Sequence, residues 1–144
     1  MRPFYVAAVV LAWPLSLPAQ DAPAPPAPTP TLTIDLNAAE QTDTGCLVTF
    51  VADNKRPAGI AALVLETVLF DTSGQVTQMT MLDFATLPAH STRVRQFNIA
   101  GQPCDGIGRV LFNGVQTCDG GDATPAQCAA ALAVSTRTDI AVSQ

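Results

Sequence analysis

The chain has 144 residues, of which 48% are hydrophobic, and its formal net charge is −5. Its 7 lysines and arginines are scattered and form no basic face, which disfavours binding to nucleic acid and to anionic lipid. The length is that of one domain, and the apolar content is sufficient for a hydrophobic core.

Residues 1–19 have the pattern of an export signal. Arg2 supplies the positive start, and residues 4–17 supply the apolar stretch. The alternative is an uncleaved membrane anchor, but this stretch is shorter than the roughly 20 residues of a spanning helix and contains Pro14. We therefore expect cleavage near Ala19 and a periplasmic location. Loss of Arg2 then changes the net charge from −5 to −6.

Residues 20–31 are rich in proline and alanine. Such a run favours polyproline II and cannot form a core, so we interpret it as a stiff spacer. The alternative is a partner-binding role for the proline-rich run. No later segment is long and apolar enough to span a membrane, and the leader lacks twin arginines, which favours the general secretory route.

From residue 32 onward, apolar residues recur at every second position, which predicts strands. The expected strands cover residues 32–36, 46–53, 60–71, 76–84, 92–100 and 109–117. Helix is the competing interpretation of residues 60–71, but the short polar turn after Phe70 favours a hairpin. A short helical piece is expected over residues 125–133, with Pro125 in its first turn. Residues 135–144 are weakly patterned and are expected to be a mostly loose tail.

The four cysteines form an even set in a chain with an export signal, which predicts two disulfides among Cys46, Cys104, Cys118 and Cys128. The alternatives are free thiols and a zinc site, but zinc ligands usually come in close pairs, whereas the intervals here are 58, 14 and 10 residues. Sequence alone leaves three pairings open. We favour Cys46–Cys104 with Cys118–Cys128, because the first bond would join two distant strands and the second would close the loop after the last core strand.

Short strands, regularly spaced turns and the lack of a βαβ pattern predict an all-β fold. We expect an antiparallel, immunoglobulin-like β-sandwich of about six to seven strands over residues 32–134, with a short C-terminal helical piece and two disulfides. The single tryptophan, Trp13, lies in the leader, so "immunoglobulin-like" describes architecture and not kinship. The expected inner residues are Ile34, Val48, Phe50, Leu65, Leu69, Leu82, Phe97, Val110 and Phe112.

A set of short segments between about residues 32 and 128 has a distinctive pattern. They are Leu36-Asn37, Cys46, Phe50, Asn54, Leu69-Phe70-Asp71, Gly74, Phe97, Ile99-Ala100-Gly101, Cys104-Asp105, Ile107-Gly108-Arg109-Val110-Leu111, Asn113, Cys118 and Cys128. The set resembles a family of small exported proteins of Gram-negative bacteria often labelled Tat-pathway signal sequence domain proteins. The leader departs from that label because it lacks twin arginines. The resemblance implies a periplasmic location and brings no known activity.

Residue types suited to catalysis or metal binding do not form a convincing pattern. The one histidine, His90, is next to Ser91, and sequence neighbours rarely form a nucleophile–base pair. Asp71, Asp83 and Glu66 could be paired acids only by residue type, and Asp71 is better placed to bond its own turn. Residues 119–122, Asp-Gly-Gly-Asp, superficially suggest calcium but read as a turn inside a disulfide loop. We expect no catalytic residues, no cofactor and no metal.

Arg109 is the charged residue singled out as a possible interaction site. It opens an apolar strand, where an arginine must find a carboxylate or reach water, and Asp105 is the nearest acidic residue in the sequence. We favour a structural bridge between the two over contact with a ligand.

The sequence therefore predicts a non-enzymatic periplasmic interaction module that binds another envelope protein, because exposed strand edges can take partners. The alternative is a small-molecule or carbohydrate binding module that uses loops at one end of the sandwich. An enzyme ranks third. The partner and the oligomeric state are left open.

Overall fold

The computed structural model describes residues 29–121 and 123–144. The predicted signal (residues 1–19), residues 20–28 of the predicted spacer and Asp122 lie outside the described residues. Within the described part of the chain, no helix has both the length and the apolar character needed to cross a bilayer.

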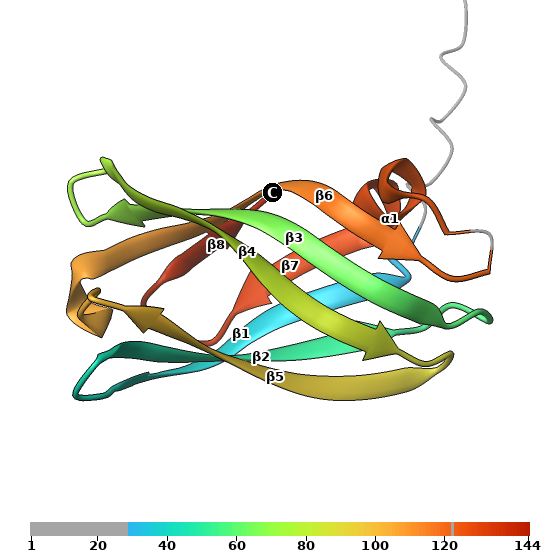
Figure 1. The fold of residues 1–144 in the computed structure, drawn as a ribbon, viewed down its shortest axis with the longest axis horizontal. Coiled ribbons are helices and arrows are strands. Elements are labelled where there is room, and N and C mark those ends of the chain that lie inside the picture. Colours follow the sequence, from blue (N-terminus) through green and yellow to red (C-terminus); the bar gives the residue numbers. More distant parts are fainter. Residues whose placement is uncertain (1–28, 122) are drawn as a thin grey trace, which may run out of the picture.

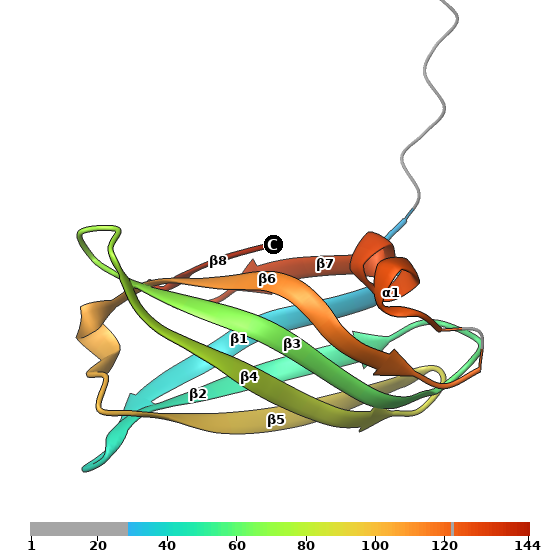
Figure 2. The ribbon, with the colours of Figure 1, turned by 45° about the horizontal axis from the view of Figure 1, so that its top comes forward.

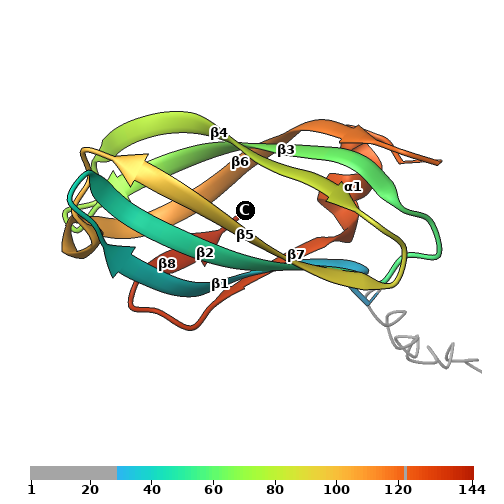
Figure 3. The same cartoon turned by 60° about the horizontal axis from the view of Figure 1, so that its bottom comes forward.

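Two sheets of four strands pack face to face, which confirms the all-β sandwich (Figure 1). Sheet A has the order β5-β2-β1-β7 and contains β1 (Leu32–Gln41), β2 (Gly45–Asn54), β5 (Ser91–Ala100) and β7 (Leu132–Thr136). Sheet B has the order β4-β3-β6-β8 and contains β3 (Ile60–Asp71), β4 (Val76–Leu87), β6 (Ile107–Asp119) and β8 (Ala141–Ser143). The other elements of the described residues are the short 3-10 turn η1 (Cys104–Gly106) and helix α1 (Pro125–Ala131). Figure 3 shows the two layers, with β2 and β5 in one and β3 and β4 in the other.

The core forms where the alternating apolar residues of the two sheets meet. Leu32, Ile34 and Leu36 on β1 are fully buried, whereas the intervening Thr33 and Asp35 point to the other face. Phe50 is completely buried and its ring lies 5.7 Å from that of Phe84, centroid to centroid. Of the nine expected inner residues, all are buried except Phe97, which packs against the core but remains partly exposed.

The last ten residues correct two of our expectations. Residues 135–144 are not a loose tail, because β7 extends to Thr136 and β8 covers Ala141–Ser143. Both strands pair in parallel, β7 with β1 and β8 with β6, so the sheets are not purely antiparallel. This segment has too few apolar residues to show the alternating pattern that predicts a strand. In the structure, its Ile140 reaches the core and is only 5% exposed.

Both disulfides have the pairing that we favoured. Cys46 on β2 is bonded to Cys104 in η1, which ties sheet A to the turn that leads into sheet B. Cys118 on β6 is bonded to Cys128 on α1, which holds the helix against the strand it follows. Figure 2 shows α1 beside the end of β6, at the start of β7.

The β3–β4 hairpin is closed by Asp71, as the sequence predicts. Its Oδ1 atom accepts hydrogen bonds from the Ser73 hydroxyl (2.6 Å) and from the backbone N–H groups of Ser73 and Gln75 (both 2.9 Å). The Ser73 hydroxyl is the main reason that the pKa of the Asp71 carboxyl is lowered, followed by the N–H of Gln75. Gly74 has a φ of 87°, a conformation that glycine adopts without strain. Asp71 is therefore a turn residue and not part of an acid pair.

Candidate interaction surfaces

Arg109 lies on the outer face of sheet B and does not pair with Asp105. Its guanidinium carbon is 4.0 Å from the centroid of the Phe70 ring, and Phe70 is its cross-strand neighbour on β3. Asp105 lies in η1, before β6 begins. The expected bridge is therefore wrong, because the outward-pointing guanidinium meets an aromatic ring on its own sheet. Such a cation–π contact contributes about 0.5–1 kcal/mol at an exposed site.

Three large apolar side chains on β4 are exposed, and we call them the β4 patch: Val76, Met79 and Met81. They are 56%, 61% and 50% exposed. The alternate residues Leu82 and Phe84 belong to the core, so Met79 and Met81 lie on the outer face of sheet B.

Apolar character continues from the β4 patch across the sheet. Met79 is opposite Val68 on β3, and Val68 is opposite Leu111 on β6. Val68 is only 6% exposed although it is not one of the residues that form the core between the sheets. Its burial therefore comes from neighbours on the outer face. Met79, Val68 and Leu111 form an apolar row across three adjacent strands, and Glu66 of β3 lies next to this row, opposite Met81.

One end of the β4 edge is already occupied by Arg95 of β5. Its Nε atom donates to the carbonyl oxygen of Phe84 (2.8 Å), and its guanidinium also donates to the carbonyl oxygen of Thr86 (3.0 Å). These bonds bridge the terminal strands of the two sheets. The rest of β4 has no partner strand on that side within the described residues.

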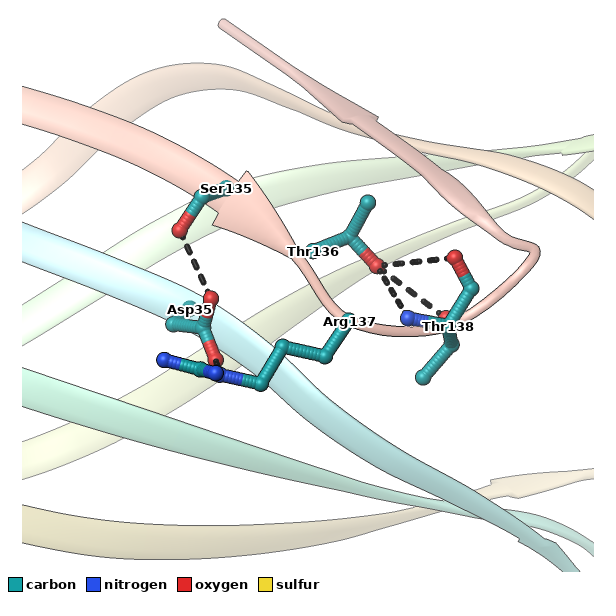
Figure 4. Close-up of polar contacts among 5 residues, drawn as sticks. All are labelled: Asp35, Ser135, Thr136, Arg137 and Thr138. Carbon is teal, nitrogen blue, oxygen red and sulfur yellow. Dashed lines mark hydrogen bonds and ion pairs between the residues drawn. The ribbon is translucent and has the colours of Figure 1, made fainter.

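The outer face of sheet A is mostly polar, apart from Val94, and carries the carboxylate of Asp35. Its oxygens accept hydrogen bonds from the Ser135 hydroxyl (2.7 Å) and from Nε of Arg137 (3.0 Å), which also forms an ion pair with it (Figure 4). Burial opposes the ionisation of Asp35, but the hydrogen bond from Ser135 and the hydrogen bond and charge of Arg137 outweigh it, so the pKa is lowered. A shallow hollow of about 410 Å³ surrounds these groups.

The Asp35 contacts predict a pH-dependent stability. Because the folded-state pKa is depressed, the contribution of Asp35 is fully present above the unfolded-state pKa, near 3.9, and is lost as the pH falls through the folded-state pKa. We expect Asp35→Asn to lower the free energy of unfolding by about 0.2–1 kcal/mol at pH 7. Urea denaturation at pH 7 and at pH 3 measures the difference from the wild type, which should be smaller at pH 3. A difference that grows at pH 3 would contradict this account.

A hollow of about 320 Å³ at one end of the sandwich contains Asp105. Asp139 and the threonines Thr72 and Thr138 also line it, so polar groups from η1, the β3–β4 turn and the β7–β8 loop converge there. No group of three or more histidine, cysteine, aspartate or glutamate side chains among the described residues could hold a metal ion. None of the residues that line the hollow is aromatic.

His90 lies in the turn between β4 and β5, and Ser91 is the first residue of β5. The backbone N–H of His90 donates to the Arg56 carbonyl (3.3 Å), and His90 has a positive φ of 50°. The Ser91 hydroxyl donates to the Pro88 carbonyl at 2.7 Å. The backbone of His90 therefore helps to form the turn, and the Ser91 hydroxyl is bonded to a backbone carbonyl.

Sequence reasoning did not identify the β4 patch. The available signal was a strand with apolar residues on both faces, Met79 and Met81 on one face and Leu82 and Phe84 on the other.

Comparisons of the chain with protein-family models, with curated protein sequences and with solved structures found no match.

Proposed function

We propose that this chain is an exported, non-enzymatic interaction module that binds another envelope protein through the β4 patch. The observation that carries the proposal is the exposure of Val76, Met79 and Met81 on a terminal strand of sheet B. Single exposed apolar residues are ordinary, whereas several together on one strand, as on β4, are typical of an interaction site. Methionine suits such a surface because its flexible side chain adapts to a partner.

The periplasmic part of the proposal is supported by two features. The two disulfides are of the kind that persists in oxidising compartments, and residues 1–19 have the pattern of an export signal. The immunoglobulin-like description is also kept as part of the proposal. The chain passes to the other sheet after each of its first two hairpins, which suits that architecture.

Capture from a periplasmic extract under mild cross-linking tests the proposal. The wild-type chain should recover a reproducible partner, and the double variant Met79→Glu/Met81→Glu should recover at least tenfold less, because two charges would have to be desolvated in the interface. The matched control is Val94→Glu on the outer face of sheet A, where Val94 is 56% exposed. Equal recovery by all three chains, or by none, would count against the proposal.

The second candidate function is binding of a small molecule or carbohydrate at the end of the sandwich. It is favoured by the 320 Å³ hollow, which is lined by Asp105, Asp139 and two threonines. It ranks below the interaction module because ligand sites are mostly lined by apolar and aromatic side chains, and aromatic residues are missing from this lining.

A further inference from the structure

The edge of β4 lacks the protection found on the other three terminal strands. β7 and β8 have 5 and 3 residues, too short to offer a long edge. β5 has 10 residues but carries Arg93 and Arg95, which repel a like-charged strand. β4 has 12 residues, and the stretch from Val76 to Leu82 contains no charged residue, no proline and no glycine.

Two features limit the part of this edge that a further strand could use. On β3, Leu69 lies opposite Gln78 and the next residue, Phe70, lies opposite Val76, so the pairing with β4 is irregular at this point. From Gln78 to Asp83 of β4, the pairing with β3 is regular. Beyond Asp83, Arg95 already binds the carbonyl oxygens of Phe84 and Thr86. The regular and unoccupied edge is therefore the segment of residues 78–83.

We propose that this edge pairs with the same edge of a second copy, in an antiparallel, two-fold symmetric dimer centred on Thr80. In this register, Met79 lies opposite the second copy's Met81, and Thr80 lies opposite the second copy's Thr80. Asp83 lies opposite Thr77, so no like charges face each other. The two four-stranded sheets B become one sheet of eight strands.

The distribution of charge along the terminal strands favours a second copy of this chain as the partner of the β4 edge. Residues 78–82 are uncharged, so the edge is complementary to itself, whereas two β5 edges would bring arginines together. Pairing satisfies the unpaired backbone groups of β4 and covers Met79 and Met81, which are among the most exposed large apolar residues of the described chain. Because both copies are acidic, added salt should strengthen the dimer. The dimer covers part of the β4 patch and so competes with the partner proposed above, although it does not depend on that partner.

Cysteine cross-linking tests the register directly. The four native cysteines are all in disulfides, so Met79→Cys and Met81→Cys each add a single free thiol on the same strand. Directly opposite residues have Cβ atoms about 4.5–5.5 Å apart, close to disulfide geometry, whereas diagonal neighbours are about 7–8 Å apart. On mild oxidation, a mixture of the two variants should form covalent dimers at least fivefold faster than either variant alone. Equal rates in the mixture and in the single variants would overturn the proposal.

Sedimentation of the mature chain provides the second measurement. The wild type and Val94→Lys should show a concentration-dependent dimer, and Met79→Lys should remain monomeric with unchanged thermal stability. A wild type that stays monomeric up to about 1 mM, or a dimer that Met79→Lys leaves intact, would overturn the proposal. A monomeric wild type that still captures an envelope partner would remove the dimer and leave the proposed function standing. A wild type that forms the dimer but captures no envelope partner would support the dimer and contradict the proposed function.

Discussion

Replacing both Cys46 and Cys104 by alanine is expected to lower the free energy of unfolding by about 4 kcal/mol. The bond closes a loop of 58 residues, and the chain-entropy relation assigns about that value to a loop of this length. This is a large share of the roughly 5–15 kcal/mol that stabilises a typical domain. Chemical denaturation of the double variant and of the wild type, both without reductant, measures the difference.

The second disulfide provides the matched control. Cys118 and Cys128 are separated by only 10 residues, so the same relation gives about 3 kcal/mol for Cys118→Ala/Cys128→Ala. The long-range variant should therefore be the less stable of the two. The opposite order would show that the loss of the α1 attachment, and not loop length, dominates the effect.

Phe50→Ala is expected to destabilise the domain by about 3–5 kcal/mol, because the substitution leaves a cavity at the centre of the core. Phe50 is completely buried. Its ring centroid lies 5.7 Å from Phe84, 6.1 Å from Phe97 and 5.8 Å from Phe112. The measurement is the urea midpoint, with an unchanged dependence on denaturant as evidence that only stability has changed.

Phe97→Ala is the control for the core variant. Phe97 belongs to the same aromatic cluster but lies on the terminal strand β5 and keeps part of its surface in solvent, so its loss should cost clearly less. If Phe50→Ala does not fold, Phe50→Leu replaces it, with a smaller expected cost because less volume is removed from the core. An equal loss for Phe97 and Phe50 would contradict the placement of Phe50 at the centre of the core.

The two outer faces of the sandwich differ in chemistry, and this difference is the basis of the functional proposal. On the outer face of sheet A, the carboxylate of Asp35 accepts hydrogen bonds from the neighbouring Ser135 and Arg137. The face of sheet B leaves Met79 and Met81 in solvent and holds its cation, Arg109, over an aromatic ring. An apolar partner surface therefore fits sheet B better, because sheet A exposes only one large apolar side chain, Val94, among the described residues.

Several parts of this protein follow from residues that are close together in the chain. The alternation of Leu32, Ile34 and Leu36 indicated β1, and Asp71 before a Gly74 turn indicated the β3–β4 hairpin. The even number of cysteines indicated two disulfides, although it left their pairing open. These signals are local because strand period and turn chemistry act over a few residues.

Other features depend on residues far apart in the chain and are visible only once the strands have assembled into sheets. Arg109 contacts Phe70 and not the nearby Asp105, because sheet pairing places β6 beside β3. The segment of residues 135–144 forms part of both sheets because β1 and β6 offer it free edges, which its own short pattern could not reveal. The β4 patch stays exposed for the same kind of reason: strand order makes β4 a terminal strand, and no periodicity within β4 encodes its neighbours.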